Sequence, residues 1–396
     1  MLRGVRTAAV AILWLVPLLI FVSAFSSGWV HTWRTFGVPS MTPPFVDLYS
    51  IPTAIETLHQ GGDPLVKNLA DPYHRPLNYP RVWMYLFSAA GITTGNISTA
   101  AISFCALYLG CISFLILDTK HPADAAILLV AGLSASPLFA IERGNNDMFI
   151  FALVFLACFV RNGYLKSGLF GAASLLKLYP IIAMIIDGMR RPVKERISAV
   201  PPVLFVTTLI LLQWRDVTLI RNSTPISSLL SYGAFSLEGE LLHETVRWGF
   251  LASLGWVVVA ECWLIGALAM RTIWGKSSEP DASLTNSKSA ELFSIFGGIY
   301  VFTYAVGSNW DYRLIFLLPT LPLAMELARG VRHKLWAVTY LISVGIAENS
   351  IALRASVGTL AGHAATFILF ILLLTMLTSQ AKNLYPDRTR LRLAEA

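Results

Sequence analysis

Charged residues are scarce in this chain. Asp, Glu, Lys and Arg make up 13% of its 396 residues, against about 25% in soluble domains. Hydrophobic residues make up 55% of the chain, and the mean hydropathy is +0.63. So few charges cannot cover a water-facing surface, and so many apolar residues exclude a disordered chain. The composition predicts a polytopic membrane protein.

Cysteine is also rare, and no CxxC pair occurs. The four cysteines, Cys105, Cys111, Cys158 and Cys262, all lie in apolar stretches. We expect these cysteines to be small core residues rather than to form disulfides or to bind a metal. The net charge of +7 then indicates cytoplasmic loops rich in Lys and Arg rather than a nucleic-acid partner.

Ten apolar stretches are candidates to cross a bilayer core of about 30 Å, which takes roughly 20 helical residues. They cover residues 8–25, 98–117, 124–141, 147–160, 197–214, 249–270, 292–307, 312–328, 335–347 and 357–379. The first is preceded by Arg3 and Arg6 and is interpreted as a retained helix with a cytoplasmic N-terminus.

Two further apolar stretches do not fit a simple crossing. Residues 168–186 contain Lys177 and Pro180 and are flanked on both sides by basic clusters. A single crossing would place one cluster outside, against the positive-inside rule. We therefore expect a re-entrant pair of half-helices with its turn at Lys177 and Pro180, and an interfacial helix on the outer face over 81–94.

The expected architecture is all-α: about ten transmembrane helices, a re-entrant helical hairpin and outer-face interfacial helices. Residues 1–396 form a single integral membrane domain without an internal repeat. Residues 26–97 are the first extracytoplasmic loop, whose prolines and glycines predict turns rather than helices. Residues 275–289 are expected to be a cytoplasmic linker. The protein is predicted to lie in the plasma (inner) membrane, with both termini in the cytoplasm.

Polar residues gather in four clusters on the predicted outer side. These are the 26–97 loop, with Asp47, Tyr49, His74, Arg75 and Tyr79, and the segments 142–147, 177–180 and 309–313. Solvated loop residues or structural ion pairs would explain any one cluster alone. Lys177 is harder to explain so, because a charge at membrane depth costs roughly 2.5–3.5 kcal/mol or more.

Together the clusters bring cations beside carboxylates at one membrane face. The cations are Arg143, Lys177 and Arg313, and the carboxylates are Asp47, Asp147 and Asp311. Cations at the membrane boundary suit a lipid-linked phosphate, and a nearby carboxylate can act as a general base on a hydroxyl. This pattern indicates group transfer from a lipid phosphate to an acceptor on the outer side.

At these same residues the chain resembles the GT-C superfamily, and specifically glycosyltransferase family 87, which uses polyprenyl-phosphate sugars. The order of short motifs carries the resemblance: Asp47 with Tyr49, the turn 62–65, Tyr79-Pro80, Arg143-Gly144-Asn145, Lys177 to Pro180, and the segment 309–313. The resemblance implies a GT-C-like fold and a mannose-like donor, with a glycan or glycolipid acceptor.

The resemblance also implies roles for residues. Asp47 would be the catalytic base of an inverting transfer. Arg143, Lys177 and Arg313 would bind the donor phosphate. Sugar binding, acceptor binding or orientation would fall to Tyr49, His74, Arg75, Tyr79, Glu142, Asn146, Asp147, Tyr179, Asp311 and Tyr312.

No cofactor or metal is indicated, and the sequence has no DxD. Glu238, Glu240, His243 and Glu244 could assemble metal ligands, although a solvated acidic loop is favoured. A transporter or flippase of a lipid-linked or anionic substrate is the alternative, and a scaffold subunit is a weaker one. A transporter would place charges along a path open to both sides, often in paired halves, so the one-sided clusters favour the enzyme.

Overall fold

The computed structural model describes residues 2–224, 287–352 and 358–384, and positions 227, 230–234 and 236 between them. The predicted span 249–270, most of the linker 275–289 and the acidic group at 238–244 lie outside these residues. The described residues are nearly all helical, with two short strands. The all-α prediction is confirmed for this part of the chain.

The first 118 residues contain two long apolar helices and three shorter ones. The elements are α1 (Leu2–Ser27), α2 (Trp29–Thr35), α3 (Val46–His59), α4 (Val82–Ala89) and α5 (Ile97–Asp118). Helix α1 packs against α2, α5 and α6. Helix α4 confirms a helix within 81–94.

The prediction that turns dominate the 26–97 loop is wrong for residues 46–59. Helix α3 forms there because its apolar residues recur at helical spacing, and Leu48, Ile51 and Ala54 are buried. An acidic residue in the first turn, Asp47, also interacts favourably with the helix dipole. One consequence is that Asp47 and Tyr49 are held by a helix rather than by a loop.

The middle of the chain is built from helices interrupted by breaks. They are α6 (Pro122–Gly132), α7 (Ala135–Arg143), α8 (Asp147–Phe159), α9 (Gly163–Leu176) and α10 (Ile181–Arg190). The predicted single span 124–141 is a pair bent by 45°. Pro137 in the first turn of α7 lacks the N–H that would continue the α6 hydrogen bonds. The break at Lys177–Pro180 is confirmed, and α9 and α10 pack against each other.

The remaining elements complete the bundle. They are a 3-10 segment (Val193–Ala199), α11 (Val200–Leu212), α12 (Trp214–Ser223), β1 (Ser231–Tyr232), α15 (Lys288–Val306), β2 (Asn309–Trp310), the 3-10 segment η4 (Asp311–Thr320), α16 (Leu321–Arg329), α17 (Lys334–Asn349) and α18 (Gly358–Leu384). Strands β1 and β2 pair antiparallel, with Ser231 opposite Trp310. One continuous α-helix over 312–328 is wrong, since Pro319 and Pro322 each remove a donor from its hydrogen-bond ladder.

Five described helices are long and apolar enough to cross a membrane, or six if the bent α6–α7 pair counts as one span. They are Leu2–Ser27, Ile97–Asp118, Glu195–Leu212, Lys288–Val306 and Ala361–Ala381. Helix α8 is apolar but shorter. The described residues therefore do not confirm the predicted count of about ten.

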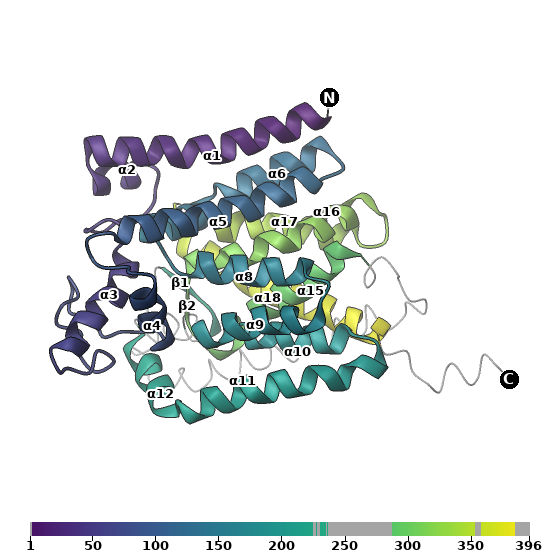
Figure 1. The fold of residues 1–396 in the computed structure, drawn as a ribbon. Coiled ribbons are helices and arrows are strands. Elements are labelled where there is room, and N and C mark those ends of the chain that lie inside the picture. The colour runs from purple at the N-terminus through teal and green to yellow at the C-terminus, as the bar shows by residue number, and fades with distance from the viewer. Residues whose placement is uncertain are drawn as a thin grey trace, which may run out of the picture.

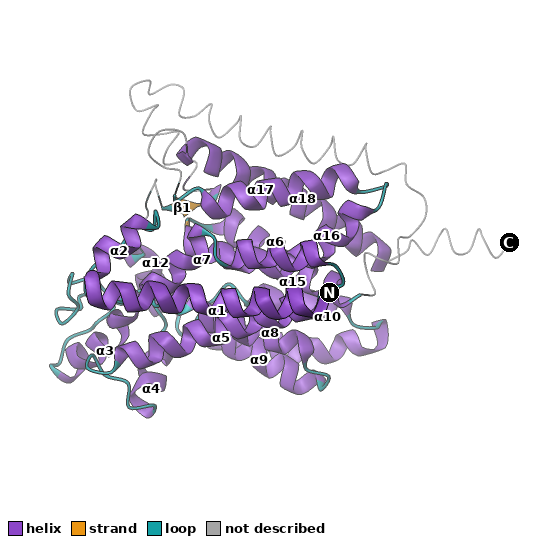
Figure 2. Ribbon diagram, turned by 90° about the horizontal axis from the view of Figure 1, so that it is seen from above, coloured by secondary structure: helices purple, strands orange, loops and turns teal. Residues whose placement is uncertain are grey.

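The helices run roughly along one axis, and the short elements gather at one end. Figure 1 shows α2, α3, α4, α12, β1 and β2 at the left end, and the N-terminus at the opposite end. Figure 2, turned by 90°, shows the same separation. Helix α7 also lies toward the left in Figure 2. This end collects the four polar clusters.

Candidate active site

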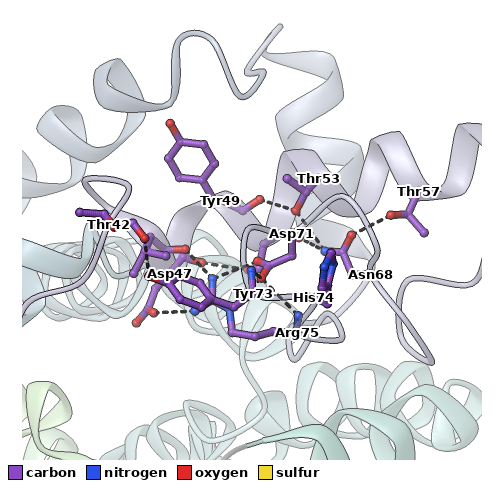
Figure 3. Close-up of polar contacts among 12 residues, drawn as sticks. Thr42, Asp47, Tyr49, Thr53, Thr57, Asn68, Asp71, Tyr73, His74 and Arg75 are labelled. Carbon is purple, nitrogen blue, oxygen red and sulfur yellow. Dashed lines mark hydrogen bonds and ion pairs between the residues drawn. The ribbon is translucent and has the colours of Figure 1, made fainter.

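Asp47 lies in the first turn of α3 and keeps 17% of its side chain exposed. One carboxylate oxygen, Oδ1, lies 3.3 Å from Nη1 of Arg75, and the other, Oδ2, accepts a hydrogen bond from Nδ2 of Asn145 at 3.1 Å. Figure 3 shows the approach of Arg75 to Asp47. Each oxygen has one protein donor, so lone pairs remain for a ligand.

Arg75 is itself fixed by Asp71. Its Nε and Nη2 donate to the two carboxylate oxygens of Asp71, both at 3.0 Å, and Nη2 also donates to the carbonyl of Val46 at 2.7 Å. Burial alone would lower the pKa of the Arg75 guanidinium, but the hydrogen bond to Asp71 and the charge of Asp47 raise it above its ordinary value. The guanidinium therefore stays charged.

A second carboxylate, Asp147, is fully buried at the start of α8. Its Oδ1 lies 2.7 Å from Nζ of Lys177 and accepts a hydrogen bond from the Tyr179 hydroxyl at 2.6 Å. Its Oδ2 lies 3.3 Å from Nε of Arg313. The Nη1 of Arg313 donates to Oδ1 of Asn309. Two cations that are 136 residues apart thus share one carboxylate.

Asn145 joins the two carboxylates. Its Nδ2 donates to Asp47, while its Oδ1 accepts from the backbone N–H of Asp147 at 2.9 Å. Lys177 lies 5.0 Å above the ring of Tyr79 and interacts electrostatically with Asp47. The carboxylate of Asp47 and the cations around Asp147 form one site.

Burial, and then the charge of Asp47, raise the pKa of the Tyr79 hydroxyl well above its ordinary value. Tyr79 therefore stays neutral. A neutral ring beneath Lys177 stabilises the ammonium through its quadrupole without adding a charge.

Gly144 allows the link between α7 and α8 to reach α3. Its φ is +59°, and a Cβ there would lie 2.8 Å from Cβ of Phe45. Phe45 is fully buried, also has a positive φ, and directly precedes α3. Only glycine permits this approach at low cost, and the approach brings Asn145 within reach of Asp47.

Arg143 belongs to an adjoining layer. Its Nε lies 3.0 Å from Oε2 of Glu142, whose Oε1 accepts hydrogen bonds from Trp29, Ser40 and the backbone N–H of Met41. The guanidinium lies 5.0 Å above the ring of Phe139. That ring also contacts Trp310 and Tyr312. Arg143 is therefore separated from Tyr312 by one aromatic ring and does not pair with Asp147.

The family model of glycosyltransferase family 87 matches residues 78–296. The chain belongs to glycosyltransferase family 87. No curated protein and no solved structure matches the chain. The family and the apolar helices make the protein a membrane glycosyltransferase. The matched range includes Asn145, Asp147 and Lys177 but stops short of Asp47 and Arg313.

Two predicted site residues of this glycosyltransferase do not join the site. The ring of Tyr49 points away from Asp47 (Figure 3). The ring of His74 is exposed and hydrogen-bonds to the carbonyl of Leu69 at 2.9 Å. Both residues were expected near the substrate because they belong to the polar outer loop that carries the family resemblance. The helical turn at α3 and the positive φ of His74 direct them elsewhere.

Two other predicted site residues of the glycosyltransferase, Asn146 and Asp311, are buried. Asn146 is 1% exposed, and neither polar atom of its amide has a hydrogen-bond partner. Asp311 is buried at the start of η4, and its backbone N–H donates to the carbonyl of Leu230 at 2.9 Å. The amide of Asn146 therefore has no contact that gives it a role here.

Sequence reasoning missed several residues that hydrogen-bond to the site residues of the glycosyltransferase. Asn145 was part of a motif but had no role, and Asp71 and Asn309 were not assigned to the site. The spacing of Asp71 and Arg75, four residues apart, was an available signal. Arg81 forms ion pairs with Asp63 and Asp216 at 2.8 Å each. The pair with Asp216 could not be inferred, because Asp216 lies in α12, which is distant in the sequence.

Within the described part of the glycosyltransferase, no group of three or more His, Cys, Asp or Glu side chains could hold a metal ion. Cys105, Cys111 and Cys158 are buried free thiols. The acidic residues at 238–244 lie outside the described residues, so that prediction stays open.

Proposed function

We propose that this family 87 enzyme moves a mannose-like hexose from a polyprenyl-phosphate sugar to a glycan or glycolipid acceptor on the extracytoplasmic side, with inversion. The observation that supports the proposal most is the single site joining a partly exposed carboxylate, Asp47, to the pair of cations at Asp147 through Asn145. A base and an anion-binding group are the two functions that this chemistry needs.

In the proposed step, the acceptor hydroxyl oxygen attacks the anomeric carbon and forms the new glycosidic bond. The bond between that carbon and the phosphate oxygen breaks, and its electron pair leaves with the polyprenyl phosphate. The hydroxyl proton passes to Asp47, which later releases it to water. The geometry parallels inverting glycosidases, with an acceptor alcohol in place of water. Phosphate is a good leaving group, so no second acid is required.

The cations would stabilise the charge that grows on the phosphate. Lys177 and Arg313 share the single charge of Asp147, so this cluster retains one net positive charge. Preorganised cations in a poorly solvated site act strongly on developing charge. We assign donor phosphate binding to Lys177 and Arg313, with Arg143 contributing from its adjoining layer.

We place this site on the extracytoplasmic face of the plasma membrane, with both termini in the cytoplasm. The proposal rests on the distribution of Lys and Arg between the two ends of the bundle. The site lies at the end that carries α3, α4 and β2, away from the N-terminus (Figure 1).

The test uses the purified protein in lipid vesicles with a radiolabelled polyprenyl-phosphate mannose and a glycolipid acceptor. The proposal expects a labelled glycolipid whose new anomeric configuration is opposite to that of the donor. Label that crosses the bilayer without forming a glycosidic bond would support the transporter alternative instead. A product of retained configuration would contradict the inverting mechanism.

A further inference from the structure

The side chain of Arg75 reaches Asp47 from the loop between α3 and α4, which also carries Tyr79. We propose that Arg75 is a positioning residue for glycosyl transfer, which fixes the orientation of the Asp47 carboxylate. The inference rests on the proposed function of Asp47 as the base.

One edge of the Arg75 guanidinium is anchored before it meets Asp47. Asp71 accepts from both Nε and Nη2, and such bidentate pairs fix the plane of the guanidinium. The Asp71 side chain is fully buried. Its Oδ1 also accepts from the backbone N–H groups of Tyr73 and Arg75, so the turn that carries the guanidinium is itself fixed.

The other contacts of Arg75 go to the start of α3. Nη2 donates to the carbonyl of Val46, the residue just before Asp47, and Nη1 lies against Asp47 Oδ1. Arg75 thus contacts both the backbone and the carboxylate at the start of α3. Because its nitrogens are engaged by protein groups, it is poorly placed to bind a sugar and well placed to orient Asp47.

Several titratable or charged groups act on Asp47. Those that interact with it electrostatically are Arg75, Lys177, Tyr79 and Tyr312. Among the described residues, Arg75 makes the one direct ion pair with Asp47. Without Arg75, the Asp47 carboxylate would lose the charged group that contacts it directly, and its orientation would no longer be fixed from this side.

The same loop offers a matched control. Asn68 is buried and ties the loop to α3 through Thr57, Thr53 and the carbonyl of Ser50, without touching Asp47. Figure 3 shows both sets of contacts. Asn68→Ala weakens the attachment of the loop to α3 but leaves the Arg75–Asp47 pair in place. It therefore separates loop stability from the orientation of the carboxylate.

The experiment compares wild type, Arg75→Gln, Arg75→Lys and Asn68→Ala, each as full-length protein in vesicles. Thermal unfolding of each variant is measured so that only folded proteins are compared. The measurements are kcat and KM for a polyprenyl-phosphate mannose. We expect Arg75→Gln to lower kcat by about 10²-fold with a change in KM below about 3-fold. Arg75→Lys keeps the positive charge but not the bidentate pair with Asp71, so it should restore only part of kcat.

A second arm combines Arg75→Gln with Asp47→Asn. If Arg75 acts through Asp47, the double variant should be no slower than Asp47→Asn alone. The proposal is overturned if the Arg75→Gln loss falls on KM, if Asn68→Ala reproduces the loss of kcat, or if the losses from Arg75→Gln and Asp47→Asn add in the double variant. If Arg75→Gln does not fold, Arg75→Lys carries the test, because it should lower kcat while leaving KM nearly unchanged. A wild type that transfers no sugar from this donor would instead reject the proposed function itself.

Discussion

At the scale of single residues, the site depends on how buried charges are balanced. The carboxylate of Asp147 neutralises part of the combined charge of Lys177 and Arg313, and it also accepts a hydrogen bond from Tyr179. The three charged groups come from different elements and are mutually dependent. Removing one partner of a buried pair costs far more than the pair contributes, because the other charge is left unpaired.

Substitution of Asp147 should therefore destabilise the protein more than substitution of either cation. Asp147→Asn leaves Lys177 and Arg313 without a carboxylate, and we expect a loss of about 3–5 kcal/mol in the free energy of unfolding. Lys177→Gln leaves Asp147 paired with Arg313 and should cost less stability while abolishing most transfer. Chemical denaturation in detergent measures the ranking. Equal losses from both variants would contradict the shared-carboxylate arrangement.

At the scale of elements, the close approach of the α7–α8 link to α3 assembles the site. The approach needs a positive φ and no side chain at Gly144, because Phe45 fills the space where a Cβ would lie. The two ends of this contact are Asn145 and Asp47, which hydrogen-bond across it. Packing between elements thus sets the distance from the base to the cations.

Gly144→Ala should therefore lower both stability and activity. We expect about 1–3 kcal/mol of destabilisation from overpacking and backbone strain, with a fall in kcat as Asn145 moves away from Asp47. Gly110→Ala is the matched control, since a Cβ there meets nothing within 4 Å and alanine favours a helix. Thermal unfolding and kcat of both variants provide the measurement. Unchanged kcat in a folded Gly144→Ala protein would contradict the positioning role of this contact.

At the scale of the whole molecule, the bundle has two chemically different ends. The site occupies one, with α3, α4 and β2, and the N-terminus lies at the other (Figures 1 and 2). The proposed orientation places the site end outside the cell. The exposed valines Val66 (59%) and Val331 (95%) give one reporter position in the loop after α3 and another between α16 and α17.

Thiol labelling tests this orientation. In a Cys262→Ser background, Val66→Cys should react with a membrane-impermeant maleimide in intact cells, and Val331→Cys should react only after permeabilisation. The other native cysteines, Cys105, Cys111 and Cys158, are buried and should stay unreactive. Labelling of both positions from one side would refute the two-ended topology.

The sequence predicted what local pattern and charge determine. Composition was enough for a helical membrane protein, and the basic clusters on both sides of residues 168–186 predicted the break at Lys177–Pro180. Asp147, the partner of the Lys177 ammonium, was among the candidates. The bend at Pro137 and the 3-10 segment ending near Pro319 follow from prolines whose effect depends on packing.

The directions in which side chains point could not be predicted from the sequence. The ring of Tyr49 leaves the site because α3 turns it away, and Asn145 enters because Gly144 permits a tertiary contact with Phe45. Such contacts join segments about 100 residues apart, and no local spacing encodes them.

The most direct test of the central claim is the single-turnover rate of sugar transfer by Asp47→Asn, with donor saturating and folding verified by thermal unfolding. Asp63→Asn, in the same loop but paired with Arg81, is the matched control. Loss of the base should reduce the Asp47→Asn rate by about 10²–10⁴-fold while Asp63→Asn retains most of its rate. An Asp47→Asn enzyme that transfers sugar at the wild-type rate would contradict the account.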